Sequence, residues 1–208
     1  MKQNIQTNFS DASNIFFTSD THFSHENIMH FCNRPFETIE EMNDTLIENW
    51  NKVVNKDSIV FHLGDFAWGN NWMQFLNKLN GHKILIMGNH DFKNKDATAL
   101  AKGFDYVCQQ LYINVEHRKV ILNHCPILCY GGTYRKDEDK VYQLFGHVHS
   151  GKYTNNALNK GLDYERLKIL FPTQYNVGVD NNDFTPISWY DVNNKIQEQI
   201  KNNKNQYL

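Results

Sequence analysis

The chain has 208 residues, of which 40% are hydrophobic, and this size and composition suit a single globular domain with a sizeable core. Its formal net charge of -2 provides no general basic field, which weighs against extended nucleic acid as a partner. The sequence has neither an apolar run long enough to span a membrane nor the apolar stretch of a secretory signal near its start. We therefore expect a cytoplasmic protein without a membrane partner.

We expect one domain over residues 1–208, with a polar leader at 1–13 and a frayed end at 201–208. A first strand is predicted over Asn14–Ser19, followed by a short helix between Phe23 and Phe31. The next helix begins after Thr38, because Thr38 as N-cap and Glu41 three residues later form a capping-box pattern.

The pattern of strand, helix and strand continues up to Met87. Ile59–His62 is short, apolar and β-branched, as in a central strand, and Ile84–Met87 is a second apolar run. Between them, apolar residues recur at helical spacing over 72–79 and end at Gly81. This alternation predicts βαβ units with parallel strand pairing.

Beyond Phe104 the predicted strands follow one another closely, over 106–108, 111–115 and 119–122, which favours hairpins. Further strands are expected at 144–145, 174–179 and 186–190, and a last amphipathic helix at 192–200. Two loops are expected, a charged connector over 135–140 and an irregular segment over 150–172 that would lie over the site as a flap.

Polar side chains follow five of the predicted strands at the point where each strand ends. A single Asp or His at such a place is more often a turn residue or a satisfied polar group. Five strand ends of this kind can meet at one edge of a sheet structure, where sites are commonly built. The residues are Asp20 and His22, then Asp65, then Asn89 and His90, then His124, and finally His147 and His149.

In chain order these residues form the motifs Asp-x-His, Gly-Asp, Gly-Asn-His-Asp, His and Gly-His-x-His. This ordered set, between Ile15 and about Asp180, resembles the calcineurin-like metallophosphoesterase superfamily, and in particular its small bacterial and phage-encoded members. The resemblance implies an α/β fold with four layers, an αββα sandwich of two mixed sheets with helices outside.

The resemblance also implies a cofactor of two divalent metal ions that share Asp65. The first would be held by Asp20, His22, Asp65 and His149, and the second by Asp65, Asn89, His124 and His147. Mixed imidazole, carboxylate and amide ligands favour manganese, with iron, zinc or nickel as alternatives, over magnesium or calcium.

The implied activity is metal-dependent hydrolysis of a small phosphomonoester or phosphodiester, such as a nucleotide, by in-line attack of a metal-bridging hydroxide. Two other functions stay open at this point. One is a nuclease acting on short or end-exposed nucleic acid. The other is a scaffold that keeps the fold as a binding surface without turnover, although scaffolds are expected to lose ligands and every matched position is filled here.

His90 matches the superfamily position that donates a proton to the leaving oxygen or grips the phosphate, and the alternative for His90 is a structural role. Trp68 and Gly69 stand where phosphoprotein phosphatases carry an Asp and an Arg. This difference argues against a phosphoprotein substrate.

Arg34 is the only arginine close in sequence to a metal motif, and a guanidinium suits bidentate contact with phosphate. We therefore take Arg34, His25 and Asn27 as candidate substrate-binding residues. The alternative for Arg34 is that it caps a turn or pairs with Glu37.

Overall fold

The computed structural model describes residues 5–94, 97–128, 130, 141–149 and 170–204. The expected charged connector and nearly all of the expected flap segment lie outside these described residues. Within the described part of the chain, no helix is both long enough and apolar enough to cross a membrane.

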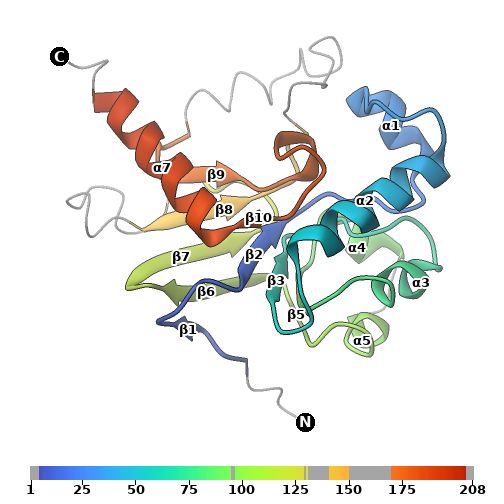
Figure 1. Ribbon diagram of the computed structural model, residues 1–208, viewed down its shortest axis with the longest axis horizontal. Helices are drawn as coiled ribbons and strands as arrows, with labels where there is room; N and C mark the ends of the chain where they lie inside the picture. Colours follow the sequence, from blue (N-terminus) through green and yellow to red (C-terminus); the bar gives the residue numbers. More distant parts are fainter. Residues whose placement is uncertain (1–4, 95–96, 129, 131–140, 150–169, 205–208) are drawn as a thin grey trace.

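The strands form two sheets that lie next to each other in Figure 1. In spatial order, the first sheet consists of β10 (Ile187–Ser188), β2 (Ile15–Thr18), β3 (Ile59–His62), β4 (His82–Ile86) and β5 (Tyr106–Cys108). The second sheet consists of β1 (Asn8–Phe9), β6 (Gln110–Val115), β7 (Arg118–Asn123), β8 (Tyr142–Phe145) and β9 (Gln174–Asn176).

Both sheets are mixed. In the first sheet β2, β3, β4 and β5 run parallel and β10 is antiparallel to β2, which confirms the predicted βαβ arrangement. In the second sheet β6 and β7 form the expected hairpin. The pairs β7–β8 and β8–β9 are parallel, so the expectation that this half consists mainly of hairpins was wrong. Parallel neighbours need long connections, and the chain has them on both sides of β8.

The strands of the first sheet bury side chains on both faces, because successive residues point to opposite sides of a strand. In β4 and the residue after it, Ile84 and Ile86 join the core between the two sheets, whereas Leu85 and Met87 join the core beneath the helices. This is why the run is apolar without alternation.

Three helices cover the outer face of the first sheet, α1 (Glu26–Cys32), α2 (Ile39–Val53) and α3 (Trp72–Leu76). The predicted start of α2 is confirmed, because the Glu41 amide donates to Thr38 Oγ1 at 3.1 Å and the Glu37 amide donates to Glu41 Oε2 at 2.8 Å. The expected sandwich of two mixed sheets with helices outside is therefore present (Figure 1).

The last helix, α7 (Trp189–Lys204), packs against β2, β9 and β10. It starts earlier and ends later than expected, which corrects the predicted strand over 186–190 and the frayed end over 201–204. The Asp191 amide donates to Ser188 Oγ at 3.1 Å, and Ser188 Oγ donates to Asp191 Oδ2 at 2.6 Å. Ser188 is therefore an N-cap that ends the strand and begins the helix.

The polar leader also needs correction, because part of it belongs to the fold. β1 pairs in parallel with β6, and Phe9 is 6% exposed within the core between the sheets. One apolar side chain among polar neighbours gives no periodic pattern, so only the tertiary pairing defines this strand. Three short helices complete the described chain, α4 (Asn89–Asn94), α5 (Ala97–Leu100) and η2 (Val179–Asn181).

Candidate metal centre

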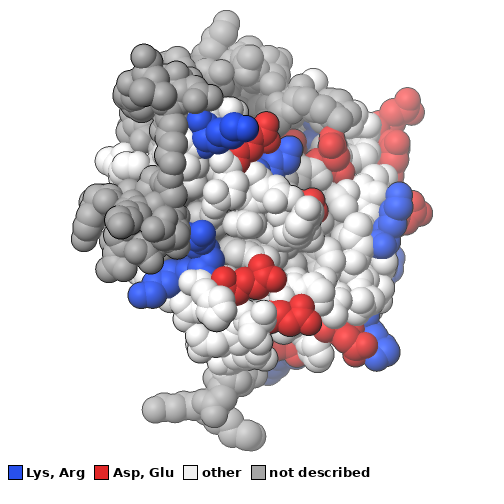
Figure 2. All heavy atoms as spheres, turned by 60° about the vertical axis from the view of Figure 1, so that its left-hand side comes forward, with Lys and Arg blue, Asp and Glu red and all other residues white. Residues whose placement is uncertain are grey.

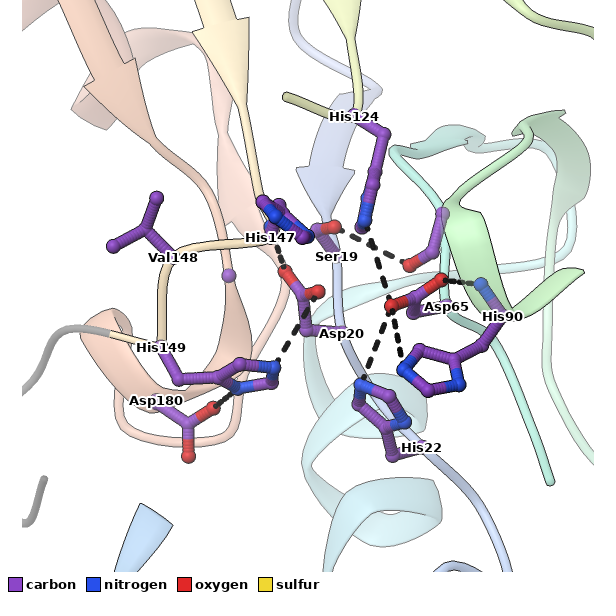
Figure 3. A network of polar contacts seen from close by, with 12 residues as sticks. Ser19, Asp20, His22, Asp65, His90, His124, His147, Val148, His149 and Asp180 are labelled. Carbon is purple, nitrogen blue, oxygen red and sulfur yellow. Dashed lines mark hydrogen bonds and ion pairs between the residues drawn. The ribbon is translucent and has the colours of Figure 1, made fainter. Parts of the chain in front are cut away.

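The candidate site lies where strand ends of both sheets meet. The carboxyl ends of β2, β3 and β4 share one edge because these strands are parallel, and β7, β8 and β9 bring theirs to the same place. A β-bridge between Ser19 and Gly178 joins the two sheets at this point. The sequence-predicted residues of Figure 3 therefore come from separate strand ends but converge on one centre.

Four of these residues have left-handed backbone conformations, with φ of 59° at Asp20, 50° at His22, 55° at Asp65 and 66° at His147. Non-glycine residues rarely adopt this conformation, and those that do cluster at functional sites, where the surrounding structure holds them. In this chain the conformation turns each segment sharply as it leaves its strand.

Two glycines allow close approaches within the site, Gly88 to the Asp65 carboxylate and Gly64 to the ring of His124. A Cβ on Gly88 would lie 2.3 Å from Asp65 Oδ1, and a Cβ on Gly64 would lie 2.6 Å from His124 Nδ1. Gly64 also has a φ of +95°, which disfavours any side chain. These contacts explain why a glycine precedes Asp65 and another precedes Asn89.

The buried carboxylate of Asp65 lies at the middle of the site. Its Oδ2 is 3.4 Å from His124 Nε2 and 3.6 Å from His22 Nε2, and its Oδ1 accepts a hydrogen bond from the His90 amide at 2.8 Å (Figure 3). Burial alone would raise the pKa of Asp65, but the contacts with His124 and His90 outweigh burial and lower it. The group is therefore a carboxylate at neutral pH.

His124 is held in one orientation by two oxygen atoms. Nδ1 donates to the Leu63 carbonyl at 2.7 Å, so Nε2 faces Asp65 and lies 3.0 Å from Asn89 Oδ1. Burial lowers the pKa of His124, but its bond to Asp65 and the charge of Asp20 outweigh burial and raise the pKa to about 9. An Nδ1 fixed by a carbonyl while Nε2 faces acceptors is the usual arrangement of a metal-ligating histidine.

On the other side of the centre, Asp20 lies between the two histidines of the Gly-His-x-His motif. Asp20 Oδ2 accepts from the His147 amide at 2.9 Å, and Asp20 Oδ1 lies 3.9 Å from His149 Nε2. The ring of His147 is exposed and its centroid is 5.0 Å from that of His124. The Asn176 side chain donates to the carbonyl of Val148 at 2.6 Å, which fixes the backbone between the two histidines.

Arg34 does not point into the site, which corrects the expectation that it contacts substrate. Its side chain is fully buried and binds both oxygens of Asp180, with Nε at 2.8 Å from Oδ1 and Nη2 at 2.9 Å from Oδ2. The remaining donors reach the carbonyls of Asp20 and Thr21 and the sulfur of Met42. All five N–H groups are therefore used, and Arg34 anchors the first metal motif to Asp180. Its alternative partner, Glu37, is not used.

His25 and Asn27, the other two candidates for substrate contact, do line the cavity over the centre. His25 Nδ1 lies 3.1 Å from His22 Nδ1, and its ring stacks on Trp68 with centroids 4.2 Å apart and planes 7° apart. Burial, then the charges of His90 and Arg34, lower the pKa of His25 to about 4. The ring is therefore neutral at pH 7.

Sequence reasoning gave no role to Asp91 or to Asp180. Asp91 is fully buried and accepts from the amides of Asp65, Phe66 and Gly88 at 2.7, 3.2 and 2.9 Å, so it ties the loop after β3 to the loop after β4. Its place in the Gly-Asn-His-Asp motif was the available signal.

Cys125 was also not predicted. Its sulfur lies with ligand atoms of His124 and His147 inside one group of potential metal ligands.

The donors present fit divalent metal ions. Asp20 Oδ1 and His22 Nε2 are buried and have no hydrogen-bond partner within the described chain, although burying such atoms unpaired is costly. Both belong to groups of potential ligand atoms within 4.8 Å of one another, Asp20–His22–His149 and Asp20–Asp65–His124. Carboxylate oxygen and imidazole nitrogen together suit divalent transition metals.

Two mixed sheets with a carboxylate- and imidazole-rich centre at their joined strand ends define a metal-binding phosphoesterase fold. The chain belongs to the calcineurin-like phosphoesterase family, whose model matches residues 13–184. Membership indicates a hydrolase of phosphate esters, and the family normally binds divalent metals.

The relatives include proteins without a stated activity. The chain is 51% identical over 81 residues to uncharacterized protein MJ1445 of Methanocaldococcus jannaschii, covering 37% of this chain and 46% of that protein, less than half of its length. It is 32% identical over 167 residues to the gene 66 protein of Mycobacterium phage L5, covering 66% and 78%. The crystal structure of AQ665, a protein of unknown function from Aquifex aeolicus, matches with a TM-score of 0.63 and 27% identity over 86% of this chain and 97% of that one.

Proposed function

We propose that this protein is a dinuclear-metal phosphoesterase that hydrolyses a small phosphomonoester or phosphodiester. The observation that carries the proposal is the position of Asp65 Oδ2, which faces His124 Nε2 at 3.4 Å and His22 Nε2 at 3.6 Å. A carboxylate placed between two sets of imidazoles suits a shared ligand, because its negative charge offsets the repulsion between two nearby cations.

The proposed ligands follow from the sequence motifs and from this arrangement. One cation would take Asp20, His22, Asp65 and His149, and the other would take Asp65, Asn89, His124 and His147. The mixture of nitrogen and oxygen donors favours manganese. A pair of divalent cations supplies a nucleophile at neutral pH and stabilises the charge on the transferring phosphoryl group.

The chain itself orients these donors. Hydrogen bonds donated by Nδ1 of His124 to the Leu63 carbonyl and by Nδ1 of His149 to Asp180 fix each ring so that Nε2 faces the centre. The Asp91 carboxylate holds the two backbone segments that carry Asp65 and Asn89. Pre-set donors lower the cost of reorganisation during the reaction, which is a main source of electrostatic catalysis.

His90 is proposed to give a proton to the leaving oxygen. Its Nε2 lies 4.0 Å from Asp65 Oδ2, the longest of the imidazole contacts to that atom, and its side chain is 27% exposed, compared with 4% for His124. A ring that borders the centre and still reaches the cavity can contact a substrate oxygen. This position supports the role of a general acid rather than a metal ligand.

A small substrate is favoured over extended nucleic acid. The cavity over the centre has a volume of about 480 Å³, in the range that holds one small molecule. Figure 2 shows one face on which acidic and basic side chains are interspersed without a continuous basic stripe. The net charge of -2 agrees with this distribution.

Hydrolysis of bis-p-nitrophenyl phosphate with added manganese tests the proposed activity. We expect turnover that EDTA abolishes and manganese restores, and we expect Asp65→Asn to lose both turnover and bound metal because an amide cannot offset two cations. A non-catalytic scaffold would give no turnover at any metal concentration. Full metal content with wild-type turnover in Asp65→Asn would overturn the dinuclear arrangement.

A further inference from the structure

The cavity over the candidate metal centre is lined by two chemically different sets of side chains. One set supplies the carboxylate, amide and imidazole groups of the centre. The other set is apolar or aromatic and contains Ile28, Phe31 and Trp68. No Lys or Arg is among the described residues that line this cavity. Under the proposed function, the metal ions and the imidazoles would balance the phosphate charge, and the apolar and aromatic set can contact another part of the substrate.

Phe31 and Trp68 are exposed aromatic side chains of this cavity, at 55% and 41%. The other three tryptophans of the chain are at most 7% exposed, so the position of Trp68 is not typical of this fold's own packing. Exposed apolar surface beside a polar site commonly marks a place where a ligand binds.

Trp68 is also held in place. Its ring stacks on the imidazole of His25 with centroids 4.2 Å apart and planes 7° apart, and its amide donates to the Phe23 carbonyl at 2.7 Å. His25 in turn contacts His22 in the metal centre. A rigid aromatic ring loses little conformational entropy when a flat ligand stacks on it.

We infer that Phe31 and Trp68 form an aromatic wall that stacks against a nucleobase, so the substrate is a phosphate ester that carries a base. This inference rests on the proposed phosphoesterase function. A base beside a phosphate occurs in a free mononucleotide and at the end of a short strand. Every nucleobase has a π face, and stacking on protein aromatics is tolerant of sequence.

Binding to Trp68 provides a measurement that does not depend on turnover. AMP added to the manganese-loaded protein is expected to quench the fluorescence of Trp68 in stopped-flow mixing. Ribose 5-phosphate, which lacks the base, is expected to displace bound AMP only at a concentration higher than that of AMP. Loss of stacking corresponds to about a 5- to 150-fold weaker affinity, the equivalent of about 1–3 kcal/mol.

Three variants identify the contact. Trp68→Leu should remove the quenching signal, and Phe31→Leu should weaken AMP binding at least fivefold more than it weakens ribose 5-phosphate binding. Phe92→Leu is the matched control, because Phe92 is 49% exposed but does not line the cavity. Equal affinity for AMP and ribose 5-phosphate, or quenching that persists in Trp68→Leu, would overturn the aromatic wall.

The source of the base and the proposed function are tested separately. A 5′-phosphorylated trinucleotide that competes with AMP and binds more tightly than AMP would assign the wall to strand ends. Weaker binding of the trinucleotide than of AMP would assign the wall to free nucleotides. If the protein hydrolyses bis-p-nitrophenyl phosphate but binds AMP no more tightly than ribose 5-phosphate, the wall is refuted and the phosphoesterase function stands. Base-selective quenching without hydrolysis of any phosphate ester would refute the function and leave the wall standing.

Discussion

The imidazole of His149 donates from Nδ1 to Asp180 Oδ2 at 2.7 Å, and the same carboxylate is bound at both oxygens by Arg34. Burial would raise the pKa of Asp180, but the charges of Arg34 and His149 lower it well below its usual range. His149 is therefore oriented by a carboxylate that stays ionised. Such partners behind a metal-ligating histidine fix its ring and raise its basicity.

Asp180→Asn should weaken metal binding by about 10- to 100-fold, because an amide holds His149 less firmly. It should also lower the free energy of unfolding by about 3–5 kcal/mol, because the buried guanidinium of Arg34 loses its counter-charge. Manganese titration calorimetry and urea denaturation measure the two effects. The exposed Asp44→Asn is the control, and equal manganese affinity in both variants would contradict the role given to Asp180.

The contact between Arg34 and Asp180 also shows what the sequence alone cannot provide. The two residues are 146 positions apart and neither lies in a periodic pattern, so only the packing of η2 against the segment after α1 brings them together. An arginine near a metal motif equally suits phosphate binding and structural pairing. Burial decides between these roles, and burial at a loop is set by tertiary structure.

The strand ends were predictable for a local reason. An apolar run followed by a glycine and then a polar group carries its meaning within a few residues, as in the stretch from Ile84 to His90. The second sheet was less predictable, because β7, β8 and β9 pair in parallel across long connections that show no pattern of their own. The convergence of Asp20 and His149 follows from that topology.

Divalent cations should stabilise the folded protein. Asp20 and Asp65 are both 2% exposed and face the same centre, so manganese bound there offsets two buried negative charges that the unfolded chain would leave in water. At a concentration 100 times its dissociation constant, manganese should add about 2.7 kcal/mol to the free energy of unfolding. Calorimetric melting with manganese and with EDTA measures the change. If manganese raises the free energy of unfolding of Asp65→Asn by the same amount, the stabilising ions bind elsewhere.

The metal-free protein should lose stability as the pH falls from about 6.5 towards 4. His25 has a pKa lowered to about 4 in the folded state, first by burial and then by the charges of His90 and Arg34. Because the unfolded chain titrates near pH 6.5, it binds more protons than the folded state across this window, and stability falls there.

His25→Asn should reduce this pH dependence by up to about 1.4 kcal/mol per pH unit while keeping an acceptor near His22 Nδ1. Urea denaturation in EDTA at several pH values provides the measurement. A slope unchanged by His25→Asn would show that this imidazole is not the group that resists protonation.

The two roles of imidazole at the centre should separate in His124→Asn and His90→Asn. The ring of His124 is buried between Asp65 and Asn89, so its replacement should lose metal and activity together for every substrate. His90 contacts Asp65 mainly through its backbone amide, and its ring is 27% exposed at the edge of the cavity. His90→Asn should therefore keep its metal content and its fold.

Turnover in His90→Asn should fall by roughly two to four orders of magnitude for an alkoxide leaving group such as a ribose oxygen, the usual contribution of a positioned general acid. The loss should shrink for p-nitrophenolate, because this group leaves without needing a proton. Elemental analysis of both variants, with the two kinds of substrate assayed side by side, gives the comparison. Equal metal loss in the two variants would show that His90 is a metal ligand. An equal loss of turnover in His90→Asn on both leaving groups would show that another residue donates the proton.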